Sequence, residues 1–302
     1  AIGIAPGERS KSTGTLSRLY DFMLGHRIAR DDLVLAVGGG VVSDLAGYAA
    51  ATVLRGVRWG VISTTLLGMV DAAIGGKTGI NHSSGKNLIG AFWQPRFVLC
   101  DTCFLKTLAP RHRLAGWGEV AKYAGLVGGK LLTRIVEREP ETLDAENPEL
   151  LRIIRDCAAY KAHVVAVDER EAGRRMLLNF GHTLGHGIET AAGHARLLHG
   201  EAVILGLWAA TELSILSDHA DESDLADYRD LLRPLLAELP RVKVDPRAVM
   251  KATGLDKKRS GQSLRFVLLA APGSPLIADN ISEAHAKKAL QITLSHLMQA
   301  EG

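Results

Sequence analysis

The fold class is decided by the stretch Leu33-Val-Leu-Ala-Val-Gly-Gly-Gly-Val-Val-Ser-Asp-Leu-Ala-Gly-Tyr-Ala-Ala-Ala-Thr-Val-Leu54. Its first five residues are all apolar, which is typical of a strand buried in a parallel sheet. Three glycines then end the strand, and the pattern over residues 41–54 predicts a helix. A strand, a glycine-rich turn and a helix in this order indicate a Rossmann-like α/β domain.

The same alternation extends on both sides of this stretch. Residues 16–23 have helical spacing behind a cap at Ser12 or Thr13, and residues 59–62 and 97–100 predict two more strands. We therefore expect a parallel sheet covered on both faces. After Lys106 the pattern becomes helical, around residues 112–137, 149–167, 179–192, 199–217, 223–238 and 282–299, with one strand signal at 264–269.

This change of pattern predicts two domains. Residues 1–108 would form an α/β domain that binds NAD, and residues 109–302 a mostly helical domain that binds metal and substrate. The cleft between two such domains is the usual place for a ligand. The chain begins at Ala1 in what reads as a loop, so we also expect an N-terminal piece to precede it.

Composition excludes several classes of protein. The 302 residues include 36 Lys and Arg against 33 Asp and Glu, a net charge of +3 without any basic block, so we expect no nucleic-acid partner. No charge-free apolar run approaches the roughly 18 residues of a membrane span, and no signal peptide is evident. Three cysteines do not make a disulfide framework, which favours a reducing, cytoplasmic location.

Two glycine-rich segments are candidates for phosphate binding. The first is the turn Gly38-Gly39-Gly40, where backbone N–H groups at a helix N-terminus favour an anion. It is not a full G-x-G-x-x-G, because Ser43 stands at the last position, and a plain tight turn explains it equally well. The second segment reads as loops that carry Gly76-Lys77 and Gly85-Lys86, and lysines on such loops commonly hold phosphates.

The helical half contains a possible metal set. His182 and His186 are four residues apart and so share one helix face, and Glu119 and Lys122 share a face of an earlier helix. Two histidines and one carboxylate with an open position form a catalytic zinc arrangement. Spacing alone leaves the ligands open among His182, His186, Glu189, His194, His199 and Glu201.

Taken together, the motifs resemble the 3-dehydroquinate synthase family of sugar phosphate cyclases over nearly the whole chain. The resemblance rests on Gly38-Gly-Gly-Val-Val-Ser-Asp-Leu-Ala-Gly47, Thr64-Thr-Leu-Leu67, Gly75-Gly-Lys-Thr-Gly-Ile-Asn81, Lys86-Asn-Leu-Ile-Gly-Ala-Phe92, Glu119-Val-Ala-Lys122, Asn179-Phe-Gly-His-Thr-Leu-Gly-His186, Leu198-His-Gly-Glu-Ala-Val203 and Asp256-Lys-Lys258.

The resemblance implies a specific reaction. The family uses NAD and zinc, or cobalt in its place, to convert 3-deoxy-D-arabino-heptulosonate 7-phosphate to 3-dehydroquinate and phosphate in the shikimate pathway. A ring hydroxyl is oxidised transiently, phosphate is eliminated, the carbonyl is reduced again, and the ring closes by an aldol step. The resemblance also implies a homodimer and a small sugar phosphate as the substrate.

Site residues follow from the resemblance by motif match. The metal ligands would be Glu119, His182 and His199, with His186 left to transfer protons. Substrate contacts would come from Lys77, Asn87, Lys122, Lys161, Arg175, Asn179 and Lys257. NAD contacts would come from Glu8, Lys11, Gly39, Gly40, Val41, Val42, Ser43, Asp44, Thr64, Thr65, Asp71, Lys77, Lys86, Phe104 and Thr107.

Two other functions compete with this interpretation. One is a related cyclase that acts on sedoheptulose 7-phosphate, on glucose 6-phosphate to give 2-deoxy-scyllo-inosose, or on an amino analogue of the shikimate-pathway substrate. The other is a non-catalytic remnant that binds metal and nucleotide, suggested by Ser43 in place of the family's usual Gly. Retention of Arg175, Asn179, His186 and Lys257 favours 3-dehydroquinate synthase activity.

Overall fold

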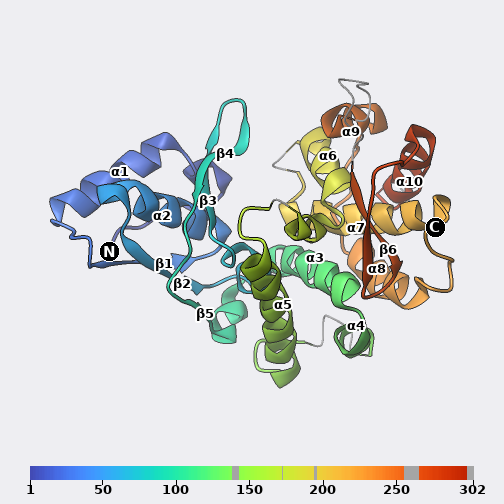
Figure 1. The fold of residues 1–302 in the computed structure, drawn as a ribbon, viewed down its shortest axis with the longest axis horizontal. Helices are drawn as coiled ribbons and strands as arrows, with labels where there is room; N and C mark the ends of the chain where they lie inside the picture. The colour runs from blue at the N-terminus through green and yellow to red at the C-terminus, as the bar shows by residue number, and fades with distance from the viewer. Residues whose placement is uncertain (138–142, 172, 194–195, 255–264, 298–302) are drawn as a thin grey trace.

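The computed structural model describes residues 1–137, 143–171, 173–193, 196–254 and 265–297. Figure 1 shows an α/β half that contains the N-terminus and, beside it, a helical half that contains the C-terminus. The hairpin β3–β4 and helix α5 lie near the junction of the two halves (Figure 1). Within the described ranges, the helices are all too short or too polar to cross a membrane.

The α/β half is built on a three-stranded parallel sheet in the order β1–β2–β5. The strands are β1 (Leu33–Gly38), β2 (Arg58–Ser63) and β5 (Val98–Cys100), with Val34 opposite Trp59 and Val61 opposite Val98. Helix α2 (Gly40–Thr52) follows the glycine turn, and α1 (Thr13–Gly25) packs on it behind its cap Ser12. The predicted strands and both helices are confirmed.

The expectation that this sheet is covered on both faces is wrong for the described residues. Leu33, Leu35, Val37 and Leu99 are each close to half exposed. The reason lies in the two crossovers. Helix α2 joins β1 to β2 on one face, and the connection from β2 to β5 runs through strand β3, which packs on α2 and therefore lies on that same face.

The segment expected to be glycine-rich loops is instead an antiparallel hairpin. It consists of β3 (Lys77–His82) and β4 (Gly85–Phe92), with Gly79 opposite Gly90. A Cβ atom added at Gly90 would lie 2.2 Å from the carbonyl oxygen of Thr78. The glycines that suggested a loop therefore allow the two strands to approach each other closely.

The helical half differs from the predicted pattern in four places. The pattern over 112–137 is two helices, because Gly128 and Gly129 both adopt positive φ angles. The helix predicted from residue 179 begins at His182, after Gly181 in the left-handed conformation. One further helix and a second C-terminal strand were not predicted. The elements are α3 (Pro110–Val127), α4 (Gly129–Val136), α5 (Pro148–Val167), α6 (His182–Ala192), α7 (His199–Leu216), α8 (Ala226–Ala237), α9 (Pro246–Thr253), β6 (Phe266–Ala271), β7 (Ser274–Ala278) and α10 (Glu283–Ser295).

Helix α7 is the buried axis of this half, and glycines let its neighbours touch its backbone. A Cβ atom added at Gly200 would lie 1.8 Å from the carbonyl oxygen of Ala115 on α3. One added at Gly206 would lie 1.8 Å from the carbonyl oxygen of Gly181, which precedes α6. These contacts hold together the three helices that carry Glu119, His182 and His199, which are α3, α6 and α7.

We expect Gly206→Ala to destabilise the protein strongly. The new methyl group has to push apart two backbones, and overpacking of this kind costs about 1–3 kcal/mol or more. Gly14→Ala is the matched control, because its Cβ atom would meet only Ser12 Oγ at 3.9 Å in α1. That variant should gain up to about 1 kcal/mol from helix propensity. Urea unfolding followed by circular dichroism measures both changes, and equal stabilities would contradict the packing argument.

Candidate active site

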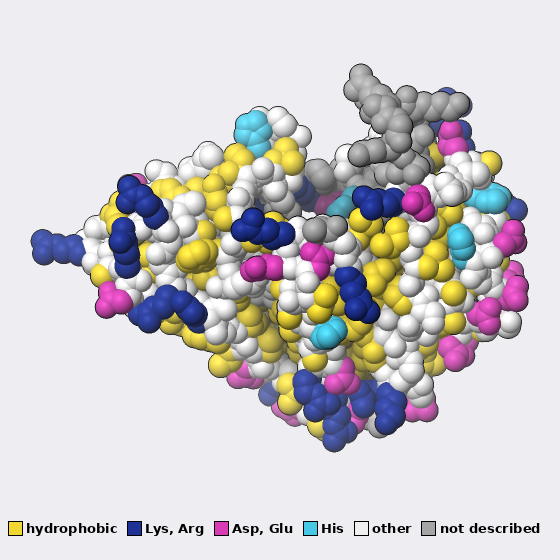
Figure 2. Space-filling view, in the orientation of Figure 1, with side chains coloured by type: hydrophobic (Ala, Val, Ile, Leu, Met, Phe, Trp, Pro, Cys, Tyr) yellow, Lys and Arg dark blue, Asp and Glu magenta, His cyan; other side chains and the backbone are white. Residues whose placement is uncertain are grey.

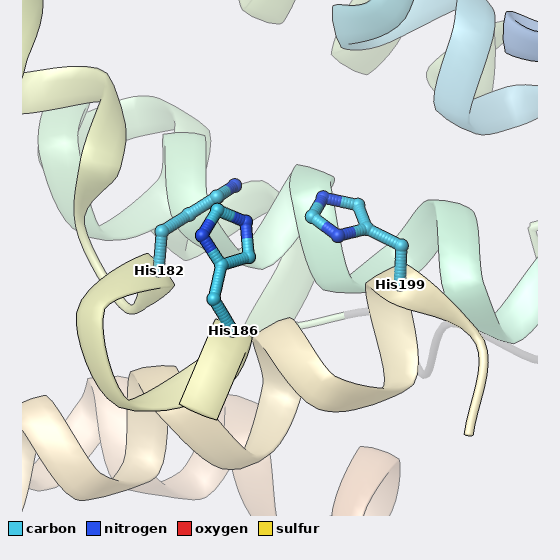
Figure 3. A group of neighbouring side chains, drawn as sticks. All are labelled: His182, His186 and His199. Carbon is cyan, nitrogen blue, oxygen red and sulfur yellow. The ribbon is translucent and has the colours of Figure 1, made fainter. Parts of the chain in front are cut away.

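Three histidines meet where α6 and α7 begin. His182 and His186 lie on successive turns of α6, and His199 is the first residue of α7. Their nearest ring nitrogens all lie within 4.8 Å of one another. Figure 3 shows the three rings gathered over the same space between the helices. Three imidazoles so placed suit a divalent transition metal.

Glu119 on α3 completes this cluster. Its Oε1 lies 3.5 Å from His182 Nε2 and 3.3 Å from His199 Nε2. The carboxylate is 1% exposed, and its other oxygen, Oε2, lies 2.6 Å from Lys122 Nζ. A buried carboxylate oxygen this close to two imidazole nitrogens suits a metal ion, because carboxylate oxygen and imidazole nitrogen are both metal ligands. Burial alone would raise the pKa of Glu119, but Lys122 and His182 hold that pKa well below its usual range.

The other ring nitrogens orient the two imidazoles nearest to Glu119. His182 Nδ1 lies 3.0 Å from the carbonyl oxygen of Phe180, and His199 Nδ1 lies 3.2 Å from Glu189 Oε2. Each contact favours the tautomer with a proton on Nδ1, which leaves Nε2 free to bind a metal. Although burial disfavours its charged form, hydrogen bonds to Glu119 and Glu189 raise the pKa of His199 to about 10. The same geometry also admits His186, so the ligand set Glu119, His182 and His199 stays a prediction.

A row of buried charged side chains lies next to the cluster formed by Glu119 and the three histidines. Lys122 Nζ lies 2.6 Å from Glu119 Oε2 and 2.9 Å from Asp71 Oδ1, and Lys161 Nζ lies 2.9 Å from Asp71 Oδ2. Tyr123 donates a further hydrogen bond to Asp71. Burial raises the pKa of Asp71, but the two ammonium groups overcome this effect and lower it. Burial lowers the pKa of Lys161, and the attraction of Asp71 does not fully offset this effect because the charge of Lys122 also lowers that pKa. Tyr123 was not predicted from the sequence.

Glu171 gathers two residues that were expected to contact substrate. Lys77 from β3 forms an ion pair with Glu171, and Asn179 Nδ2 donates to Glu171 Oε1 at 3.0 Å. Arg175 is buried beside them and donates to the carbonyl oxygens of Gly75, at 3.0 Å, and Glu169. Glu171 was missed because nothing distinguishes it from the other acids of its charged segment.

The residues expected to contact the nucleotide form a second group. Lys11 is buried, and its Nζ lies 2.6 Å from Asp44 Oδ2. Glu8 Oε1 accepts a hydrogen bond from Asn81 Nδ2 at 2.9 Å. Lys11 also donates to Asn87 Oδ1, so the side chain expected at the substrate lies with the nucleotide group in this structure.

The glycine turn provides the expected helix N-terminus. A Cβ atom at Gly39 would lie 2.7 Å from Thr65 Cγ2, and Thr64 N donates to the carbonyl oxygen of Gly38 at 3.0 Å. Ser43 is buried, and its Oγ donates to the carbonyl oxygen of Gly40 at 3.0 Å. The serine hydroxyl is therefore bonded to the backbone at the first turn of its own helix. Residues 40–42 form the first turn of α2 and present its N–H groups.

The remaining predicted residues lie elsewhere. Lys86 reaches Glu189 Oε1 at 2.5 Å, beside the histidines. Both oxygens of Glu201 are taken by Arg111, at 2.6 and 2.8 Å, and one also by Leu198 N. Phe104 and Thr107 belong to the short helix η4 (Thr102–Thr107), where Phe104 packs against the helical core. The expectations for His194 and Lys257 lie outside the described residues.

The residues expected at the substrate and those expected at the nucleotide both lie near the junction of the two halves. Figure 2 shows a notch there, between the hairpin β3–β4 and the helical half, with acidic, basic and histidine side chains near its floor. The ion pairs Lys77–Glu171 and Lys86–Glu189 each join this hairpin to the helical half. The arrangement can hold a small polyanion between the two halves, near the cluster of Glu119 and the histidines.

Asp44 should make stability depend on pH. Burial raises the pKa of Asp44 from 3.8 to about 6, although Lys11 offsets part of the rise. Between these values the folded state binds more protons than the unfolded state, so stability falls as pH rises through this window. Asp44→Asn removes the cost of ionising this buried carboxyl group. Relative to wild type, the variant should therefore gain up to about 3 kcal/mol in the free energy of unfolding between pH 4 and 7.

Urea unfolding at a series of pH values, without nucleotide, measures this difference. The lost ion pair with Lys11 shifts the variant's curve by an offset, so the slope against pH is the quantity that tests the assignment. Parallel curves for the two proteins would contradict it.

Comparison with known proteins identifies the relatives of the chain. The family profile described as 3-dehydroquinate synthase N-terminal matches residues 1–115, and the one described as 3-dehydroquinate synthase C-terminal matches residues 116–259. A curated 3-dehydroquinate synthase from Legionella pneumophila is 42% identical over 280 residues, which cover 92% of this chain and 75% of the relative.

Two solved structures have similar folds at lower sequence identity. A 2-deoxy-scyllo-inosose synthase complexed with carbaglucose-6-phosphate, NAD+ and Co2+ gives a TM-score of 0.85 at 27% identity, covering 95% of this chain and 81% of the other. The 2-epi-5-epi-valiolone synthase ValA from Streptomyces hygroscopicus, with NAD+ and Zn2+ bound, gives 0.86 at 28% identity, covering 97% and 82%.

Proposed function

The chain belongs to the 3-dehydroquinate synthase family, and we propose that it converts 3-deoxy-D-arabino-heptulosonate 7-phosphate to 3-dehydroquinate and phosphate. The observation that carries this function is the buried carboxylate of Glu119, which faces two imidazoles on one side and Lys122 on the other. This arrangement places a metal-binding group directly beside a cationic group. The reaction needs both, because its substrate carries hydroxyls as well as a phosphate and a carboxylate.

Glu119, His182 and His199 would hold a divalent zinc or cobalt ion. When bound, the metal ion would act as a Lewis acid on a substrate hydroxyl, and NAD would provide the reversible oxidation of that hydroxyl. His186 faces the same space from the next turn of α6, where it can accept or return a proton at the substrate. The family's cofactors thus fit the donor set that the chain presents.

The cationic side chains would bind and orient the substrate. Lys122 and Lys161 share the carboxylate of Asp71, and Lys122 also pairs with Glu119, so both ammonium groups are held in fixed positions next to the histidines. Lys77, Arg175 and Asn179 lie around Glu171, at the junction of the two halves. Positive groups held in place before the substrate arrives stabilise charge on a phosphate or carboxylate without reorganising. Asn87 and Lys257 complete the proposed substrate set.

The α/β half would bind NAD. We assign residues 1–108 to the nucleotide domain and residues 109–302 to the metal and substrate domain. The N-terminus of α2 suits the pyrophosphate, since backbone N–H groups and the helix dipole both favour an anion there. Lys11 and Asp44 offer polar groups in a largely buried position nearby. The proposed NAD contacts are Glu8, Lys11, Gly39, Gly40, Val41, Val42, Ser43, Asp44, Thr64, Thr65, Asp71, Lys77, Lys86, Phe104 and Thr107.

A related cyclase activity is the alternative function. It is favoured by one observation, the close fit of the fold to two cyclases of different substrate specificity. The buried Arg175 argues for 3-dehydroquinate synthase activity, because a substrate with a carboxylate gives its guanidinium a counter-ion.

Assembly and location are proposed on narrower grounds. A homodimer rests on the family resemblance alone, and light scattering of the purified chain would test it. Cytoplasmic location is supported by the three cysteines, Cys100, Cys103 and Cys157, all of which are free.

We expect the purified chain to release phosphate from 3-deoxy-D-arabino-heptulosonate 7-phosphate with NAD and zinc, and to form no net NADH. A chelator should stop the release. Glu119→Ala and His182→Ala should lose bound metal and at least about 1,000-fold in rate, because several kcal/mol of charge stabilisation disappear. Metal analysis and a phosphate assay measure both effects.

Glu212→Gln serves as the control, since Glu212 is a buried glutamate that pairs with Arg229 away from the cluster. It should keep metal and rate. Turnover of sedoheptulose 7-phosphate or glucose 6-phosphate instead would support the alternative, and full activity of the metal-free variants would refute the metal set.

A further inference from the structure

Glu189 lies next to the cluster of Glu119 and three histidines, and it contacts one of those histidines. It is on α6, one turn after His186, and is 5% exposed. Its Oε2 lies 3.2 Å from His199 Nδ1, while its Oε1 lies 2.5 Å from Lys86 Nζ. The far nitrogen of the same imidazole, His199 Nε2, lies 3.3 Å from Glu119 Oε1. The ring of His199 is thus held between two buried carboxylates.

His199 depends on this contact more than His182 does on its own partner. The side chain of His199 is 37% exposed, against 11% for His182, so packing restrains its ring less. His182 Nδ1 is held by a backbone carbonyl in the turn that begins its own helix. The partner of His199 comes from a different helix, and the ring needs that partner to keep Nε2 directed at Glu119.

Lys86 holds Glu189 in the position that this contact requires. The lysine comes from β4 in the α/β half and binds Oε1, which leaves Oε2 to His199. A carboxylate as buried as Glu189 needs a cationic partner, because burying an unpaired charge is costly. Lys86 therefore keeps the carboxylate ionised and limits its rotation.

We propose that Glu189 is a positioning residue of the metal site, which accepts a hydrogen bond from His199 Nδ1–H and so directs Nε2 to the ion. The inference rests on the metal set proposed above and extends it to a residue behind the ligands. Partners of this kind orient the ring and raise its basicity, and their loss typically weakens metal binding about 10–100-fold.

The test is metal affinity of the full chain without substrate. The apo protein is titrated with Co2+ and with Zn2+ in competition with a chelator, and the visible absorption of bound Co2+ reports its ligand environment. Glu189→Ala should weaken binding about 10–100-fold and alter the Co2+ spectrum. Glu189→Gln keeps an acceptor oxygen in the same place, so its affinity should fall between wild type and the alanine variant.

Glu212→Gln is the matched control, because it neutralises a glutamate that is also buried and ion-paired with an arginine, 3.0 Å away. It should bind metal like the wild type. Circular dichroism and urea unfolding establish that each variant is folded, and the isosteric Glu189→Gln decides the matter if the alanine variant does not fold.

The outcomes separate this inference from the proposed function. If the wild type binds neither Co2+ nor Zn2+, the metal set itself is refuted. If the wild type binds and Glu119→Ala does not, but both Glu189 variants bind as tightly as wild type with unchanged spectra, the positioning role alone is overturned. Weaker binding by the Glu189 variants but not by Glu212→Gln would establish it.

Discussion

The site depends on a row of buried charges in which each ion lies between partners of opposite sign. Lys161, Asp71, Lys122 and Glu119 follow one another at distances of 2.6–2.9 Å, and the row ends at the imidazoles of His182 and His199. Isolated ions in such a place would shift their pKa and become neutral. The row holds two cations and two anions, so removing any member would leave one buried charge uncompensated, and the row links the short helix η3 (Gly68–Ala72), which carries Asp71, to helices α3 and α5.

Close helix packing makes this row possible. Glu119 and His199 come from α3 and α7, and they approach within 3.3 Å because Gly200 lets the backbone of α7 meet that of α3 near Ala115. A larger residue there would push the two helices apart, and Glu119 and His199 with them. Glycine therefore acts at a distance from the chemistry, by setting the spacing from which the ligands project.

The sequence predicted local elements better than their pairing. The apolar run at 33–37 and the glycine turn identified β1 and α2, and the spacing of His182 and His186 placed these two residues on one helix face, because both patterns lie within short stretches of sequence. The hairpin β3–β4 was missed, since its glycines serve strand approach and resemble those of a loop. Tyr123 and Glu171 were missed, and Glu189 was considered only as a metal ligand, because their partners come from distant parts of the chain, which spacing does not show.

The two lysines of the hairpin explain why the geometry of the site depends on both halves of the molecule. Lys77 and Lys86 project from the α/β half, yet both are paired with glutamates of the helical half, Glu171 and Glu189. Glu171 also binds Asn179, and Glu189 also holds His199, so each glutamate joins the hairpin to a residue of the proposed site. A shift of the hairpin would draw both lysines away from these carboxylates, which would then lose a partner that holds them in place. The geometry of the metal and substrate groups in one half therefore depends on where the other half places two ammonium groups.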